Sequence, residues 1–325
     1  MTVLLDLSAP VAHPIDVSII IVNWNTRDLL RDCLQSIMQQ TSQPYEIIVV
    51  DNASADGSAE MVQAEFPGAI LIKNTENSGF AAANNQGLRI ARGRTVLLLN
   101  PDTIVLDHVI DRMLVWLDHH AEVGCVGCQV LEGQGIVQRT CFSDPDLLNL
   151  LIVEFGLMRL SRWISAFGRP SYTGWDRRSE RDVDVVSGMF MLVPRTVMDS
   201  VGLLDDAFFV YSEEADWCRR IRKAGYSCVF APEGQIIHLD GGSKSTSQIR
   251  SRMHVQMQKS HLIYARKHSG FLGYAAARLV YLVTSMLRLA VFAVLYLAKS
   301  NDDTKARVRL ALAATRYHLT EREPG

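Results

Sequence analysis

Two polar residues at the end of a predicted strand, Asn100 and Asp102, could hold a divalent cation. Both follow an apolar segment typical of a strand, and a carboxylate with a second oxygen ligand two residues away suits a hard divalent cation. An ordinary Asn-Pro-Asp turn is the alternative interpretation. His238 follows another apolar run and precedes residues 241–244 (GGSK), whose backbone N–H groups and lysine suit phosphate oxygens. A single histidine, however, is more often a core or turn residue.

Three carboxylates stand at the start of a helix predicted over residues 213–224. Glu213, Glu214 and Asp216 fall within four residues. Acidic residues in a first helical turn can simply complement the helix dipole, with Ser212 as the N-cap. The apolar run over 208–211 that precedes them favours a cleft instead of a solvated helix face. In such a cleft one of the carboxylates could act as a general base.

Polar residues follow each of the first four predicted strands. In open α/β sheets, ligands bind beyond the carboxyl ends of the strands, so these clusters would converge on one site. Each cluster alone could be turn chemistry, but four together favour a binding site. The segments lack the glycines of a dinucleotide-binding turn or a Walker P-loop. The clusters are Asn23-Trp24-Asn25, Asp51-Asn52-Ala53-Ser54, Asn74 with Asn77, and Asn100 with Asp102.

Strand and helix patterns alternate along most of the chain, which indicates βαβ units. We therefore predict an α/β fold with a mostly parallel, Rossmann-like sheet covered by helices on both faces. Residues 141–182 break the pattern and are predicted to form an excursion over the active face. Strands are predicted over 17–22, 46–50, 69–72, 96–99, 123–130 and 183–193, and helices over 26–40, 59–66, 80–91, 106–117 and 213–224.

The composition is that of a globular protein with an uneven distribution of charge. Hydrophobic residues make up 48% and charged residues 21% of the 325 positions, which excludes a disordered, collagen-like or coiled-coil chain. Residues 1–240 contain 19 basic and 31 acidic residues, whereas residues 241–300 contain nine basic residues and no acidic one. An acidic body followed by a basic, apolar segment indicates a membrane surface or another polyanion as partner.

The apolar segment 279–298 is interrupted near its middle by Arg288. A membrane span needs about 20 mostly apolar residues, and a central arginine costs roughly 2.5–3.5 kcal/mol. We therefore predict an in-plane or shallowly inserted helix, with a buried helix packed on the rest of the chain as the alternative. Basic residues near an anionic leaflet contribute about 1 kcal/mol each, which favours a peripheral position on the cytoplasmic face of the cell membrane.

The six cysteines do not indicate a disulfide scaffold. The first residues lack the pattern of a secretory signal, so we expect a reducing, cytoplasmic compartment. Cys125 and Cys128 could form half of a zinc site, but no second pair of this kind follows. Two small core residues in a strand are therefore the favoured interpretation.

Six segments together resemble family 2 glycosyltransferases of the GT-A fold, and among them the rhamnosyltransferase-like branch of bacterial surface polysaccharide synthesis. They occur in the order typical of that family and extend over residues 17–243. Each is common by itself, whereas the combination is specific. The segments are 17–25 (VSIIIVNWN), 49–58 (VVDNASADGS), 77–87 (NSGFAAANNQG), 98–103 (LLNPDT), 186–191 (VSGMFM) and 208–219 (FFVYSEEADWCR).

The resemblance implies a role for each candidate residue. Asp102 would be the main carboxylate ligand of the metal, because Asn100 replaces the first acid of the family's D-x-D motif, and His238 would be the second ligand. Glu214 would be the catalytic base, with Glu213 and Asp216 as alternatives because the family usually has aspartate there. The residues implied to surround the nucleotide sugar and the acceptor are Asn23, Trp24, Asn25, Asp51, Asn77, Asn84, Asn100, Ser187 and Gly188.

The implied reaction moves a sugar from a nucleotide-diphosphate sugar to a hydroxyl of a glycan or lipid-linked acceptor, with inversion and with Mg²⁺ or Mn²⁺. In this branch dTDP-rhamnose is the commonest donor, and no nucleic-acid partner is implied. The domains would be a lead over 1–16, a catalytic domain over 17–243 with an acceptor-side excursion over 141–182, and a basic, apolar helical segment over 244–325. The apolar stretch 147–160 would touch the membrane or line the acceptor path.

Two other functions fit the same residues less well. A nucleotidyltransferase on a related sheet would release pyrophosphate from a nucleoside triphosphate. A non-catalytic module that binds nucleotide sugars and acts as a membrane scaffold would release nothing. Release of a nucleoside diphosphate on addition of acceptor discriminates the glycosyltransferase from both.

Overall fold

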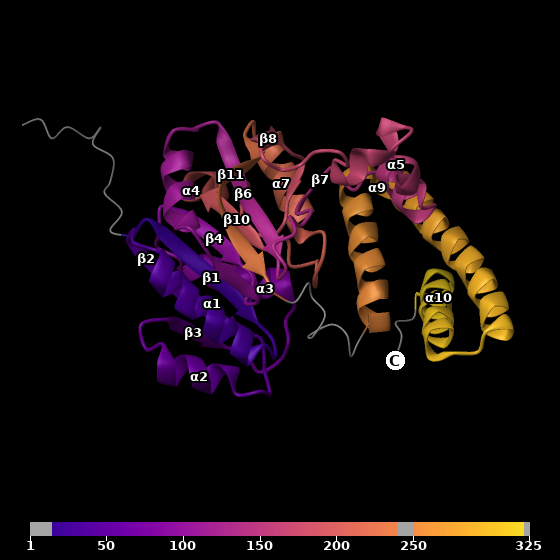
Figure 1. Ribbon diagram of the computed structural model, residues 1–325, viewed down its shortest axis with the longest axis horizontal. Helices are drawn as coiled ribbons and strands as arrows, with labels where there is room; N and C mark the ends of the chain where they lie inside the picture. The colour runs from indigo at the N-terminus through magenta and orange to yellow at the C-terminus, as the bar shows by residue number, and fades with distance from the viewer. Residues whose placement is uncertain (1–14, 240–249, 322–325) are drawn as a thin grey trace, which may run out of the picture.

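A computed structural model describes residues 15–239 and 250–321. An α/β body built around one large sheet lies beside a helical C-terminal unit, with α5 above the helices of that unit (Figure 1). The confirmed fold class is thus an α/β sheet protein followed by long C-terminal helices. The glycine-rich and basic residues 241–244, singled out above for phosphate contacts, lie outside the described residues, as does most of the N-terminal lead.

The first half of the sheet consists of four parallel strands joined by helices. Its strand order is β3-β2-β1-β4, and each neighbouring pair is parallel. Successive apolar side chains point to opposite faces: Ile19 and Ile21 lie in one core cluster, Ile20 and Val22 in the other. The elements are β1 (Val17–Asn23), α1 (Arg27–Gln40), β2 (Tyr45–Asp51), α2 (Ser58–Glu65), β3 (Ile70–Lys73), α3 (Phe80–Ile90) and β4 (Thr95–Leu99).

The second half makes the sheet mixed. The order continues β4-β10-β6-β11-β5, and β10 runs antiparallel to both β4 and β6. A parallel strand needs a connection that carries the chain back to the starting end of the sheet. The 141–182 excursion precedes β10 without such a return, so β10 runs antiparallel to its neighbours. Added elements are β5 (Thr103–Val105), α4 (Val109–Asp118), β6 (Val123–Glu132), β10 (Phe190–Pro194), α6 (Arg195–Val201), α7 (Glu213–Lys223) and β11 (Ser227–His238).

Helices cover both faces of the sheet, as predicted. One core cluster contains residues of α1, α2 and α4, and the other contains residues of α3, α6 and α7. Cys125 and Cys128 of β6 belong to opposite clusters, so they cannot bind one zinc ion together. Cys125 instead lies with Cys218 and Cys228, their sulfurs all within 4.8 Å of one another.

The segment predicted as one strand over 183–193 is two strands. β9 (Val185–Val186) pairs with β7 (Cys141–Phe142) outside the main sheet, and only β10 enters that sheet. Ser187-Gly188 separates β9 from β10 and lies at the large cavity described below. The break could not be recognised in the sequence, because β9 and most of β10 are apolar and buried.

The 141–182 excursion contains a short helix that packs on the C-terminal unit. It comprises α5 (Leu147–Glu154), the 3₁₀ turns η1 (Leu157–Leu160) and η2 (Ser165–Ser171), and β8 (Arg181–Asp182), which pairs with β11. Asp146 caps α5, accepting a hydrogen bond from the backbone of Asn149 at 2.8 Å. Leu150 then packs with Leu262 and Tyr281 of the C-terminal unit.

The C-terminal unit is a bent helix with a second helix packed on it. α9 (Arg250–Ala298) changes direction at Gly270, whose φ of 68° lies in the left-handed region. Its first half lies along the α/β body, where Tyr264 joins the core, and its second half leads away (Figure 1). α10 (Asp302–Thr320) packs on α9 and begins with a capping box between Asn301 and Thr304.

Within the described residues, α9 is the one helix long and apolar enough to cross a membrane. Its most apolar window has a mean hydropathy of 2.0, and 17% of that window is buried. Arg288, which interrupts this region, is held by the protein: its Nη1 lies 3.0 Å from Oε2 of Glu154 in α5. The alternative of a fully buried helix therefore does not describe the second half of α9, which exposes residues such as Leu279, Leu287 and Val291.

Candidate active site

A cavity of about 860 Å³ opens at the carboxyl ends of β1 and β4. Parallel strands place their C-terminal loops along one edge, which is where ligands bind in such sheets. Eight of the sequence-predicted site residues line this cavity: Trp24, Asn77, Asn100, Asp102, Ser187, Gly188, Glu214 and His238. Glu213 also lines it, whereas Asn23, Asn25, Asp51, Asn84 and Asp216 are not among its lining residues.

The strand pair β5·β11 brings Asp102 and His238 together. Thr103 lies opposite His238 in this antiparallel pair, and the backbone N–H of Leu239 donates to the carbonyl of Asp102 at 2.9 Å. As a result, Nε2 of His238 lies 3.1 Å from Oδ2 of Asp102. The other ring nitrogen, Nδ1, lies 3.1 Å from Oε1 of Gln138, which fixes the orientation of the imidazole.

These residues fit a divalent cation. The Oδ1 atom of Asp102 is buried and has no hydrogen-bond partner, so one carboxylate oxygen remains for a ligand. Asn100 lines the same cavity and offers an amide oxygen. A carboxylate, an imidazole nitrogen and an amide oxygen form a donor set that Mg²⁺ and Mn²⁺ accept.

Helix α7 presents Glu213 and Glu214 to the cavity from an abrupt start. Tyr211 and Ser212 just before it both have positive φ, 72° and 68°, a conformation that costs energy for residues other than glycine. Ser212 occupies the N-cap position as predicted, but its side chain makes no capping hydrogen bond. The strained turn places the first residues of α7 at the cavity wall instead.

Burial makes both glutamates weaker acids than an exposed glutamate. Burial raises the pKa of Glu214 from its ordinary 4.5 to about 7, and it raises that of Glu213 well above 4.5, with the charge of Glu214 adding to the effect. The Oε2 atoms of both residues are buried without a hydrogen-bond partner. A carboxylate whose pKa lies near neutrality and which faces a cavity is suited to accept a proton there.

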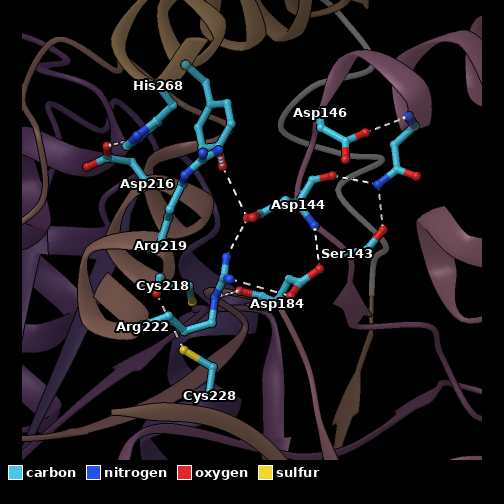
Figure 2. Close-up of polar contacts among 12 residues, drawn as sticks. Ser143, Asp144, Asp146, Asp184, Asp216, Cys218, Arg219, Arg222, Cys228 and His268 are labelled. Carbon is cyan, nitrogen blue, oxygen red and sulfur yellow. Dashed lines mark hydrogen bonds and ion pairs between the residues drawn. The ribbon is translucent and has the colours of Figure 1, made fainter. Parts of the chain in front are cut away.

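Asp216 is not among the residues that line the cavity, and Figure 2 shows its carboxylate beside His268. Its carboxylate accepts hydrogen bonds from Arg220 at 2.9 Å and from His268 at 2.8 Å, and Nζ of Lys267 lies 2.8 Å away. Burial would raise the pKa of Asp216, but the hydrogen bonds from these three partners outweigh it and hold the pKa below its usual value. Its oxygens are thus occupied by structural partners, unlike those of Glu214.

Several predicted nucleotide-binding residues brace loops instead of lining the cavity. Nδ2 of Asn23 donates to Oδ1 of Asp51 at 3.2 Å and to Ser54 at 3.1 Å, joining the ends of β1 and β2. Asn25 is exposed and accepts from the backbone of Ala55 at 2.7 Å. Asn84 is buried within α3, where it donates to the carbonyl of Phe80 at 2.9 Å.

Sequence analysis missed Asn52 as an individual site residue. Its Nδ2 donates to Oδ1 of Asn77 at 2.8 Å, and its Oδ1 accepts from Asn74 and from the backbone of Ser78, each at 3.0 Å. Asn52 thus shapes the loop after β3 while lining the cavity. Its position in the polar cluster that follows the second predicted strand was the signal that could have identified it.

The loop after β3 also touches the segment that precedes α7. The N–H of Phe80 donates to the carbonyl of Phe209 at 2.5 Å. A Cβ atom on Gly79, whose φ is +86°, would lie 2.4 Å from that oxygen, so only glycine permits the approach. This contact fixes the donor-side loop against the turn that positions Glu213 and Glu214.

The first half of α9 forms another wall of the cavity, which sequence analysis did not predict. Arg252, Gln256 and Lys259 line it from this helix. Ser260 ties α9 to the segment before α7 by donating to the carbonyl of Val210 at 2.7 Å. The chain brings residues of the basic segment to the same cavity as the acidic start of α7.

Comparison with known proteins identifies the family. Residues 18–183 match the model of glycosyl transferase family 2. The chain belongs to this family. It is therefore a glycosyltransferase that uses a nucleotide-sugar donor, and the resemblance drawn from the sequence motifs is confirmed.

Two curated relatives from bacteria share much of the chain with this family 2 glycosyltransferase. The N-acetylglucosaminyl-diphospho-decaprenol L-rhamnosyltransferase of Mycobacterium tuberculosis is 23% identical, over 78% of this chain and 85% of the relative. The O-antigen biosynthesis protein RfbC of Myxococcus xanthus is 27% identical, over 74% of this chain and 18% of its own length.

Two solved structures share the fold of this glycosyltransferase. The mannosyltransferase PcManGT of Pyrobaculum calidifontis, in complex with GDP-Man and Mn²⁺, has a TM-score of 0.54 at 19% identity, covering 94% of this chain and 88% of the other. GalNAc-T7 with UDP, GalNAc and Mn²⁺ has a TM-score of 0.52 at 15% identity, covering 70% and 44%. These likenesses support the GT-A fold class.

Proposed function

We propose that this glycosyltransferase transfers its sugar with inversion of configuration, with Glu214 as the base and a divalent cation held by Asp102 and His238. The observation that carries the proposal is that these three side chains line a single cavity. One displacement at the anomeric carbon needs one base and one stabilised leaving group. No second carboxylate is needed as a nucleophile.

Glu214 would take the proton of the acceptor hydroxyl. The acceptor oxygen then attacks the anomeric carbon from the face opposite the departing diphosphate. A pKa near 7 leaves a useful fraction of the carboxylate ionised at neutral pH and still gives it enough basicity to accept a proton. Glu213 lies beside Glu214 at the cavity, and burial together with the charge of Glu214 raises its pKa well above 4.5.

Asp102, His238 and the amide of Asn100 would hold Mg²⁺ or Mn²⁺. When bound, such a cation neutralises the charge of a departing diphosphate as a Lewis acid. The side chain of Gln138 orients His238 for this role, since it contacts the ring nitrogen that faces away from Asp102.

Trp24, Asn52 and Asn77 would bind the nucleotide part of the donor, and Ser187 and Gly188 would border the sugar. The first three follow the ends of the first three strands of the fold, and the last two lie in the break between β9 and β10. Asn23, Asp51 and Asn84 would act through the loops and helix that they brace. Asn25 would act likewise through the loop at Ala55.

For the substrates, we propose dTDP-rhamnose as donor and a lipid-linked sugar diphosphate as acceptor, in the synthesis of a bacterial surface polysaccharide or cell wall. The relative from Mycobacterium tuberculosis, named as a rhamnosyltransferase acting on a decaprenol-linked sugar diphosphate, supports this choice. The exposed apolar half of α9 supports a position at a membrane, and we propose the cytoplasmic face, where a lipid-linked acceptor can be reached.

The test is a donor screen with the purified full-length chain in detergent. A panel of dTDP-, UDP- and GDP-sugars is supplied with Mg²⁺ or Mn²⁺ and a prenyl-diphosphate-linked N-acetylglucosamine, and release of nucleoside diphosphate is followed. We expect release with dTDP-rhamnose, and a product anomer opposite to that of the donor by NMR. Pyrophosphate release from a nucleoside triphosphate would favour the nucleotidyltransferase, and donor binding without any release would favour the scaffold.

A further inference from the structure

A second cavity, of about 530 Å³, lies along α9 beside the donor cavity. Lys259 lines both cavities, so they adjoin at this residue. Arg266 and Tyr274 of α9 and Tyr317 of α10 line the second cavity alone. None of the residues assigned above to donor, metal or base is part of its wall.

Basic residues follow one face of α9 from the first cavity to the second. Arg252, Lys259 and Arg266 are spaced by seven residues, so they lie on the same face of the helix. At 1.5 Å per residue they extend over about 21 Å along its axis. Arg252 lines the donor cavity and Arg266 the second cavity, with Lys259 between them.

Arg266 is the cation of the second cavity that has room for an anion. Lys267 is paired with Asp205 at 2.5 Å, and the cavity's other acid, Glu321, is paired with Arg278. For Arg266, no carboxylate among the described residues lies within ion-pair distance. Its exposed guanidinium lies over the Phe271 ring, 5.1 Å from the ring centre.

Apolar surface begins where the basic face ends. Phe271 and Leu272 follow the bend at Gly270 and are exposed, and the second half of α9 continues with further exposed apolar residues. From one end to the other, the path thus passes from Glu214, through cations, to an apolar helix surface. A molecule with a sugar, a phosphate group and a lipid chain, in that order, has matching chemistry.

We infer that the second cavity binds the phosphate or diphosphate of a lipid-linked acceptor through Arg266, and so directs the acceptor sugar to Glu214. This inference rests on the proposed function, which supplies the acceptor class. Arg266 presents a planar donor group that suits paired phosphate oxygens. The lipid chain would leave the cavity over Phe271 and Leu272.

The test measures binding of geranylgeranyl diphosphate to the full-length chain in detergent by calorimetry. EDTA is present, so that a metal in the donor cavity cannot bind the probe. Arg266→Gln should weaken binding at least fivefold, while Arg266→Lys should keep most of it. The matched control, Lys299→Gln, removes an exposed cation near the end of α9 that lines neither cavity and should bind as the unmodified chain does.

Two comparisons identify the group that is recognised. Uncharged geranylgeraniol should bind more weakly than the diphosphate, and Arg266→Gln should not change its binding. Flotation with phosphatidylglycerol vesicles should be nearly the same for Arg266→Gln and the unmodified chain. Equal binding of the diphosphate by both, or an effect of Arg266→Gln confined to vesicle flotation, would overturn the inference and make Arg266 a contact for lipid headgroups.

The binding assay is independent of turnover, so the two proposals can fail separately. Sugar transfer to a lipid-linked acceptor that is unaffected by Arg266→Gln would leave the proposed function intact and overturn the inference. Tight, Arg266-dependent diphosphate binding in a chain that releases no nucleoside diphosphate from any donor would support the anion site and contradict the proposed reaction.

Discussion

Nε2 of His268 lies 2.8 Å from Oδ1 of Asp216 and joins the first half of α9 to the helix that presents Glu214 (Figure 2). Arg219 of α7 strengthens the same junction, because it donates to the hydroxyl of Tyr264 in α9 at 3.0 Å. Residues well beyond the region of the family match, which ends at residue 183, therefore help to hold α7 in place.

Glu214→Gln should abolish turnover and preserve donor binding, because the amide keeps the shape of the side chain but cannot accept a proton. Loss of a general base costs about 10²–10⁴-fold in rate. Turnover is measured as nucleoside diphosphate release and donor binding by calorimetry. Asp216→Asn is the matched variant and should retain much more activity while lowering thermal stability. A dead Asp216→Asn enzyme with full stability, beside an active Glu214→Gln, would reverse the assignment.

The pH profile should report the buried carboxylate. Burial raises the pKa of Glu214 to about 7, so below that pH the base is protonated, and kcat/KM should fall about tenfold per pH unit. Above it, the profile should level off. A profile that stays flat down to pH 5 would contradict a base with this pKa.

The raised pKa of Glu214 should also make the free energy of unfolding depend on pH. A carboxyl whose pKa is higher in the folded chain than in the unfolded chain favours folding when protonated. The contribution of Glu214 is therefore full below its ordinary pKa of 4.5 and is lost as the pH rises through about 7. As the pH rises through that window, the free energy of unfolding of Glu214→Gln should increase relative to that of the unmodified chain. Denaturant unfolding at pH 5 and at pH 8 measures the difference.

Removal of the metal should stop sugar transfer. EDTA should abolish turnover, and Mg²⁺ or Mn²⁺ should restore it. Asp102→Ala should weaken metal-dependent donor binding, because it removes the carboxylate whose Oδ1 has no partner within the protein. Calorimetry of donor binding with and without Mn²⁺ tests this, and Gln138→Leu is expected to give a smaller loss. Full activity in EDTA would leave the contact between Asp102 and His238 with a structural role only.

The ion pair between Glu154 and Arg288 should hold α5 on α9. Glu154 also accepts a hydrogen bond from Thr284 at 2.9 Å, and its side chain is buried. Arg288→Met leaves this carboxylate without its charged partner, which should lower the free energy of unfolding by about 1–3 kcal/mol. The double variant with Glu154→Leu should recover most of the loss. If the losses in the free energy of unfolding caused by the two substitutions simply add in the double variant, the two side chains do not interact.

Membrane association should depend on the second half of α9. A chain that ends after Ser269 keeps the half that lines the cavity and should no longer float with anionic vesicles, while its slow hydrolysis of donor should persist. Leu287→Glu with Val291→Glu should weaken flotation without truncation, since both residues are exposed. Ile136→Glu is the control, an equally exposed apolar residue on the turn after β6. Unchanged flotation of the truncated chain would refute this placement.

The sequence by itself determined the alternating strands and helices of the first half of the sheet and the identity of the family. β1 is rich in β-branched residues and β4 is apolar, a composition that favours strands buried on both faces of a sheet. The polar residues after these strands indicated the site, because the ends of parallel strands meet at one edge. Asp102, His238 and Glu214 could be named because short motifs carry their local chemistry.

The tertiary structure decided what each polar residue does. Glu214 and Asp216 are two residues apart, yet one faces the cavity and the other faces His268 and Lys267, because two residues on a helix differ by about 200° around its axis. The sequence also could not show that α9 forms part of the cavity wall or that Arg288 pairs with Glu154. Ser260 meets Val210 across 50 residues of sequence and Arg288 meets Glu154 across 134. Both contacts depend on the docking of α9, which its own helical pattern does not encode.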